Sequence, residues 1–135
     1  MKRLIVLFAA VCHFACGPAV SDHDNRIFAI PASVKLSAVD LSTAYASDAG
    51  AANDRYRGRV LEVSGVIDKT HTGGPSLRLA GSEKGPVVEA SLHEDVAAEF
   101  LKTVAGGQRI TIKCFCEGLD QLVRLKSCVT ADAPH

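Results

Sequence analysis

A change of hydrophobic period at Gly58 constrains the fold more than any other feature of this sequence. Ahead of Gly58, residues 38–56 place their larger apolar side chains on one stripe of a helix. Ser37 is a typical N-cap for that helix. From Arg59 to Ile67 the period changes to two, which predicts a strand. The sequence therefore predicts a helix that docks against the start of a first strand.

Four further strands and a second helix follow the first strand. Gly65 predicts a bend or bulge in that strand, because glycine inside a strand marks a sharp turn of the backbone. The later elements are expected at residues 76–80, 87–92, 109–116 and 122–129 (strands) and at Glu94–Thr103 (helix). Five short antiparallel strands, with a helix between the third and the fourth, describe the OB-fold, a five-stranded Greek-key barrel. We therefore predict a mainly β fold of this kind, preceded by the N-terminal helix.

The size and charge of the chain exclude some classes of function. Its 135 residues are enough for one domain, and 47% of them are hydrophobic, as in globular proteins. The formal net charge is zero. Without residues 1–15 the Lys and Arg residues fall from 15 to 13 against 15 acids, which leaves a charge near −2. Tryptophan is absent, so neither a basic surface nor a set of stacking aromatics favours a nucleic-acid partner.

The first residues have the layout of a secretory signal peptide. A basic start is followed by an apolar stretch that His13 ends well short of a membrane span. We predict a signal peptide at residues 1–15 and lipidation of Cys16, with cleavage after Ser21 as the alternative. A linker is expected at 16–36, the OB-fold domain at 37–130 and a disordered tail at 131–135.

The sequence also resembles a known family, the tRNA-anti-like OB-fold domains of bacterial lipoproteins. The resemblance begins in "AYASDAGAANDRYRGRVLEVSGVI", resumes at "GGQRITIKCFCEG" and ends at "VRLKSC". The positions that match the family pattern are Tyr45, Ala52, Tyr56, Gly58, Val63, Gly65 and Ile67 or Val66, while Asp48 stands where the family has Asn. The resemblance implies an OB-fold but says almost nothing about activity or ligands.

The cysteines outside the leader predict one disulfide and one free thiol. Disulfides persist in exported proteins, and three cysteines remain if Cys16 is lipidated or lost. The spacing alone leaves Cys114 and Cys116 as equal candidates for pairing with Cys128. The resemblance implies the bridge Cys116–Cys128, because the family pattern has its cysteines at those two positions.

Two groups of residues are candidate binding sites. Tyr45, Asp48 and Tyr56 either form a small polar pocket between the helix and the barrel or only satisfy one another's hydrogen bonds. Lys69 and His71 lie in the loop between the first two strands. That loop and the loop between the last two strands flank the ligand face of OB-folds.

Metal binding and catalysis find no support in the sequence. The run from His93 to Asp95 begins like a zinc-protease helix, but Ala97 stands where the second histidine would be. The spacing of the cysteines is not that of a structural zinc site. No motif identifies a nucleophile or a phosphate loop, and we predict neither a metal nor a cofactor.

We therefore predict an exported, lipid-anchored, non-catalytic OB-fold module that binds or interacts in the bacterial cell envelope. A periplasmic or envelope lipoprotein is expected, with a secreted soluble form as the alternative location. The expected partner is an envelope protein or a small ligand. The alternative function is an oligonucleotide- or oligosaccharide-binding OB domain that uses the loops Lys69–Gly74 and Glu117–Gln121.

Overall fold

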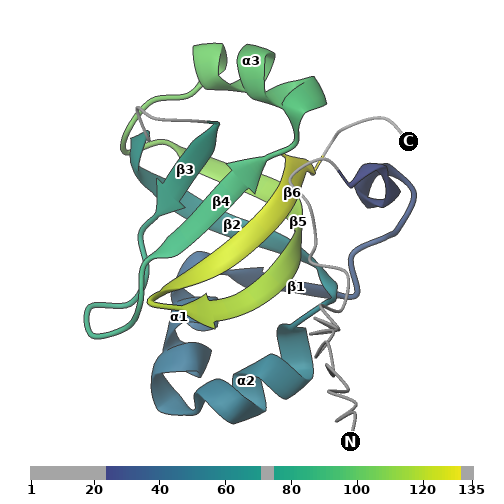
Figure 1. Cartoon of the computed structure of the whole chain (residues 1–135). Coiled ribbons are helices and arrows are strands. Elements are labelled where there is room, and N and C mark those ends of the chain that lie inside the picture. Colours follow the sequence, from purple (N-terminus) through teal and green to yellow (C-terminus); the bar gives the residue numbers. More distant parts are fainter. Residues whose placement is uncertain (1–23, 71–74, 132–135) are drawn as a thin grey trace, which may run out of the picture.

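A computed structural model describes residues 24–70 and 75–131 as a closed barrel with helices at its two ends (Figure 1). The barrel strands are β2 (Val60–Thr70), β3 (Ser76–Leu79), β4 (Val88–Leu92), β5 (Arg109–Asp120) and β6 (Leu122–Thr130). They hydrogen-bond in the order β2-β3-β4-β6-β5, and β5 pairs with β2 to close the barrel. The predicted OB-fold barrel is confirmed. One detail differs, because β4 and β6 pair in parallel and not antiparallel.

Strand β2 belongs to both halves of the barrel, as the glycine inside it predicted. Residues Val60–Val66 pair with β5, and the pairing with β3 begins at Ile67. A Cβ atom on Gly65 would lie 2.9 Å from the Cβ of Ala38, at the start of the first helix. Gly65 thus allows that helix to pack directly on the strand, and the register shift itself falls between Ile67 and Lys69.

The predicted N-terminal helix is two helices. Helix α1 (Ala38–Ser47) and helix α2 (Ala49–Tyr56) meet at Asp48, whose extended backbone ends the first and begins the second. The carboxylate of Asp48 accepts a hydrogen bond from the Ala51 amide at 3.0 Å. Aspartate is favoured at the N-cap of a helix and disfavoured in a helix interior, so the preference of this residue explains the break. Ser37 caps α1 as predicted.

The apolar stripe of these two helices closes one end of the barrel. Leu41, Tyr45, Ala52 and Tyr56 are all buried, between 0% and 6% exposed, in the same core as the inward side chains of the strands. Helix α3 (Glu94–Thr103) has the predicted bounds and covers the opposite end (Figure 1). The barrel is therefore sealed by helices at both ends.

The segment predicted as a linker is folded from residue 24 onward, so that prediction is wrong for residues 24–36. A short 3-10 helix, η1 (Asn25–Phe28), places Ile27 in a small core with Val60 and Phe115, and β1 (Val34–Ser37) pairs in parallel with β2. Ile27 is completely buried. Burial of an isoleucine side chain contributes about 1.5–3 kcal/mol, which helps to offset the entropy of ordering the segment.

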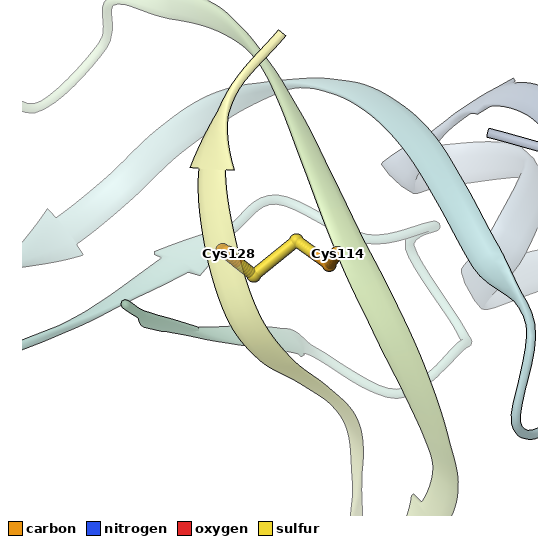
Figure 2. Close-up of a disulfide and its surroundings, with 2 residues drawn as sticks. All are labelled: Cys114 and Cys128. Carbon is orange, nitrogen blue, oxygen red and sulfur yellow. A yellow bond between two sulfur atoms is a disulfide. The ribbon is translucent and has the colours of Figure 1, made fainter. Parts of the chain in front are cut away.

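The disulfide joins Cys114 to Cys128 (Figure 2). Cys116 is a buried free thiol. The pairing Cys116–Cys128 implied by the family resemblance is therefore wrong. The reason is the strand register, since Cys116 lies opposite Leu125, three residues before Cys128 on β6. A register shift between Lys113 and Phe115 brings Cys114 within 4.2 Å of Cys128, measured between Cα atoms.

Candidate functional site

A polar pocket of ≈ 240 Å³ lies between the end of α2 and the hairpin of β5 and β6. Its lining residues are Asn53, Arg57, Glu117, Gly118, Leu119, Asp120 and Arg124. The hairpin is longer than predicted, because β5 continues to Asp120 and only Gln121, with a positive φ of 60°, separates the two strands. The expected loop at residues 117–121 is therefore mostly strand and forms one wall of this pocket.

Gly118 allows the helix to come close to the hairpin. Its φ of +100° is unfavourable for other residues, and the β5–β6 register shifts just before it. A Cβ atom at this position would lie 2.8 Å from Oδ1 of Asn53 and 3.4 Å from Cδ of Arg57. A side chain on Gly118 would therefore displace the side chains of Asn53 and Arg57 and change the shape of the pocket.

Tyr45 lies in the core next to the pocket and bonds to one of the pocket residues. Its hydroxyl donates a hydrogen bond to Oδ1 of Asn53 at 3.0 Å and lies 3.7 Å from Sγ of Cys116. Because Oδ1 accepts this bond, the amide NH₂ group of Asn53 stays available to the pocket. Burial raises the pKa of the Tyr45 hydroxyl and also that of the Cys116 thiol. Both groups are therefore neutral at physiological pH.

A row of charged side chains continues from the pocket across the outer face of the sheet. Arg124 on β6 donates to Glu89 on β4 at 3.1 Å, and Glu89 lies 3.6 Å from Nε of Arg78 on β3. These three residues are direct neighbours in the strand register, and Gly118 is the next neighbour on β5. Arg124 also lies 3.8 Å from the Asp120 carboxylate. The row therefore spans four strands.

Three polar groups of the pocket and row keep unused hydrogen-bonding capacity. Oε2 of Glu117 and Nε of Arg78 are buried atoms that have no hydrogen-bond partner among the described residues. Lys126 approaches Glu117 only to 3.9 Å. No described carboxylate forms an ion pair with the exposed side chain of Arg57. Of these three groups, the exposed guanidinium of Arg57 lines the pocket and can donate hydrogen bonds to a ligand there.

The structure separates the residues of the predicted tyrosine site. Tyr45 bonds to the pocket residue Asn53, whereas the Asp48 carboxylate caps α2. Tyr56 is buried and carries the guanidinium of Arg55 over its ring at 5.1 Å. The three side chains therefore have separate roles, and of the three only Tyr45 bonds to a pocket residue.

The other predicted site residues fall largely outside the described part of the chain. This is the case for Cys16, for His71 and for the side chain of Lys69. Within residues 24–70 and 75–131, no cluster of three or more His, Cys, Asp or Glu side chains is arranged to hold a metal ion. His93 is the N-cap of α3, where Nδ1 accepts from the Asp95 amide at 3.1 Å and Nε2 contacts Oδ1 of Asn25 at 2.9 Å.

Little in the sequence pointed to Asn53, Arg57 and Arg124 as site residues. Each looks like an ordinary polar residue on a helix or strand surface, and they come together only when α2 docks beside the hairpin. The available signal was Gly118 between Glu117 and Asp120, because a glycine inside a strand marks a bulge or a close approach of another segment.

The comparisons identify a family and nothing more specific. A family model described as tRNA_anti-like matches residues 3–129. No curated protein and no solved structure matches the chain. In the described part of the chain, none of the helices has the length and the hydrophobicity that a membrane span requires.

Proposed function

This chain belongs to the tRNA-anti-like family, and from that premise we propose that its OB-fold barrel is an exported, lipid-anchored, non-catalytic binding module of the bacterial cell envelope. The pocket between α2 and the β5–β6 hairpin is its ligand site. The observation that carries the proposal is this pocket, which lies beside the connection between the last two strands, one of the two loops that flank the ligand face of OB-folds.

The composition of the pocket supports binding without catalysis. Its walls offer two guanidinium groups, two carboxylates and an amide, and none of its lining residues is a serine, threonine, cysteine or histidine. A serine, threonine or cysteine nucleophile with an adjacent histidine base is thus missing from its walls. The free thiol of Cys116 is buried, with a raised pKa, which makes it a poor nucleophile.

Export and anchoring are supported by the leader and by the buried disulfide. The basic and apolar start precedes Ala15, Cys16 and Gly17, the order of a lipidation site. A bridge such as Cys114–Cys128 is stable in oxidising compartments. Two acyl chains on Cys16 would hold the barrel at the membrane without a spanning helix.

The mass of the protein purified from bacterial membranes tests the anchor. We expect a product that begins at Cys16 and carries the mass of the acyl chains. Cys16→Ala should abolish membrane attachment, and Cys12→Ala, a matched change within the leader, should leave it intact. A soluble product that begins at Asp22 would disprove lipidation.

Site-specific crosslinking in cells tests the pocket as the binding site. A photoreactive residue at Leu119, which is 37% exposed on the pocket rim, should capture a reproducible ligand or partner. The same residue at Ile30, also 37% exposed but outside the pocket, is the control. Equal capture at the two positions would contradict a binding role for the pocket.

A further inference from the structure

We propose that the pocket and its charged row bind an uncharged saccharide chain. This inference rests on the proposed function of the pocket as a ligand site and names the class of its ligand. The surface consists of the pocket residues Asn53, Arg57, Glu117, Gly118, Leu119, Asp120 and Arg124 and of the row residues Glu89 and Arg78; we call it the hairpin surface.

Opposite charges alternate along the hairpin surface. Arg124 lies between the carboxylates of Glu89 and Asp120, and Arg78 lies beside Glu89. Glu117 faces into the pocket next to Lys126. A phosphate bound by any of these arginines would lie within a few ångströms of a carboxylate, and the repulsion would cancel much of the attraction. The surface therefore disfavours a polyanion.

The same alternation suits hydroxyl groups. A sugar hydroxyl both donates and accepts hydrogen bonds, so it is satisfied by guanidinium and amide donors on one side and carboxylate acceptors on the other. The pocket supplies Arg57 and the NH₂ group of Asn53 as donors and the exposed carboxylate of Asp120 as an acceptor. Leu119 adds an exposed apolar surface for the C–H groups of a sugar ring.

The shape of the hairpin surface fits a short chain. The pocket, of ≈ 240 Å³, takes one end of the ligand, and the row Gly118–Arg124–Glu89–Arg78 extends from it across four neighbouring strands. Three strand spacings correspond to about 14 Å, which is long enough for a few linked sugar units. A single small metabolite would leave most of this row uncovered.

The hairpin surface lacks what a nucleic-acid site needs. Binding of single strands relies on aromatic side chains that stack with bases and on a net positive groove. None of the residues that form the hairpin surface is aromatic, and its three arginines face three carboxylates. Of the two alternative OB-fold ligands, oligosaccharide and oligonucleotide, the geometry points to the saccharide.

Nuclear magnetic resonance with the purified soluble domain, residues 17–135, tests the inference. The probes are neutral trisaccharides built from glucose, galactose or N-acetylglucosamine, with oligo-dT and dialanine as competitors. We expect at least one trisaccharide to shift the amide signals of Gly118, Leu119 and Asp120, with an affinity that is unchanged between about 50 and about 200 mM salt.

Paired arginine variants identify the site. Arg57→Ala should weaken trisaccharide binding about tenfold. Arg59→Ala removes the same charge from an exposed position outside the pocket and should leave the affinity within about twofold. Equal effects of the two variants would overturn the inference.

The outcomes separate this inference from the proposed function. If oligo-dT or dialanine shifts the hairpin signals and the trisaccharides do not, the ligand class is wrong but the pocket is still a binding site. If crosslinking at Leu119 captures a protein and none of the probes binds, the saccharide inference fails alone. If neither the probes nor crosslinking gives a signal at the pocket, both proposals fail.

Discussion

Replacement of Tyr45 by phenylalanine tests how the core supports the pocket. The change removes only the hydroxyl, which donates to Oδ1 of Asn53 at 3.0 Å and lies 3.7 Å from Sγ of Cys116. A protein hydrogen bond has a net value of about 1 kcal/mol. Asn53 is half-buried, so water can satisfy part of its lost bond, and the contact with sulfur is weak.

We therefore expect Tyr45→Phe to lower the free energy of unfolding by about 1 kcal/mol. For a domain of this size the melting temperature would fall by about 4 °C. Urea unfolding followed by circular dichroism measures the change. In the double variant with Asn53→Ala, the effects of the two substitutions should differ from additivity by about 0.5–1 kcal/mol, because the two side chains share one bond.

Tyr56→Phe is the matched control for this prediction. Tyr56 is buried to a similar extent, and its hydroxyl has no hydrogen bond to any described residue. Its loss should change the free energy of unfolding by less than about 0.5 kcal/mol. If the two variants are equally destabilised, or if Tyr45→Phe and Asn53→Ala are additive, Tyr45 does not hold Asn53 in the way described.

Three other predictions concern the thiol, the helix break and pH. Cys116 should resist N-ethylmaleimide at neutral pH until urea unfolds the chain, because burial raises its pKa; modification of the native protein, measured by mass, would contradict this. Asp48→Ala should lower the free energy of unfolding, measured in urea, by about 1 kcal/mol, because it removes the cap of α2. Asp54→Ala, at an exposed position, should lower it much less, and equal losses would exclude a capping role for Asp48. The hydrogen bond from the Arg26 guanidinium lowers the pKa of Asp24 below its ordinary value of 3.8. The Asp24–Arg26 pair should therefore stabilise the fold above pH 3.8, and this contribution should be lost as the pH falls through the pKa of Asp24 in the folded protein. Arg26→Ala should remove this acid-sensitive part of the free energy of unfolding.

The elements with a clear period were predictable from the sequence. Helix α3 and the alternating start of β2 follow from local patterns, because the burial of one face imposes a period of 3.6 or two on the residues. The break at Asp48 was also present in the sequence, as an aspartate inside the apolar stripe. The apolar stripe on both sides of it predicts one helix over residues 38–56, whereas Asp48 is a cap between two helices.

The short N-terminal elements and the disulfide depend on tertiary contacts and were missed. Segment η1 has one turn and β1 has four residues, too few for a period to be visible. The choice between Cys114 and Cys116 is decided by a register shift in the β5–β6 pair. The two cysteines are two residues apart on one strand, so their spacing is equally compatible with either bridge.

The pocket depends on three local features that act together. Asp48 ends α1 and starts α2, so the position of Asn53 and Arg57 depends on where that cap forms. Gly118 leaves the space that these two side chains occupy beside the hairpin. Tyr45 then fixes the Asn53 amide from the core side. If any of the three is lost, the donors on α2 should move relative to the carboxylates on the hairpin. Binding at the pocket should therefore be more sensitive than global stability to substitutions at Asp48, Gly118 and Tyr45, although Asp48 and Tyr45 do not line the pocket.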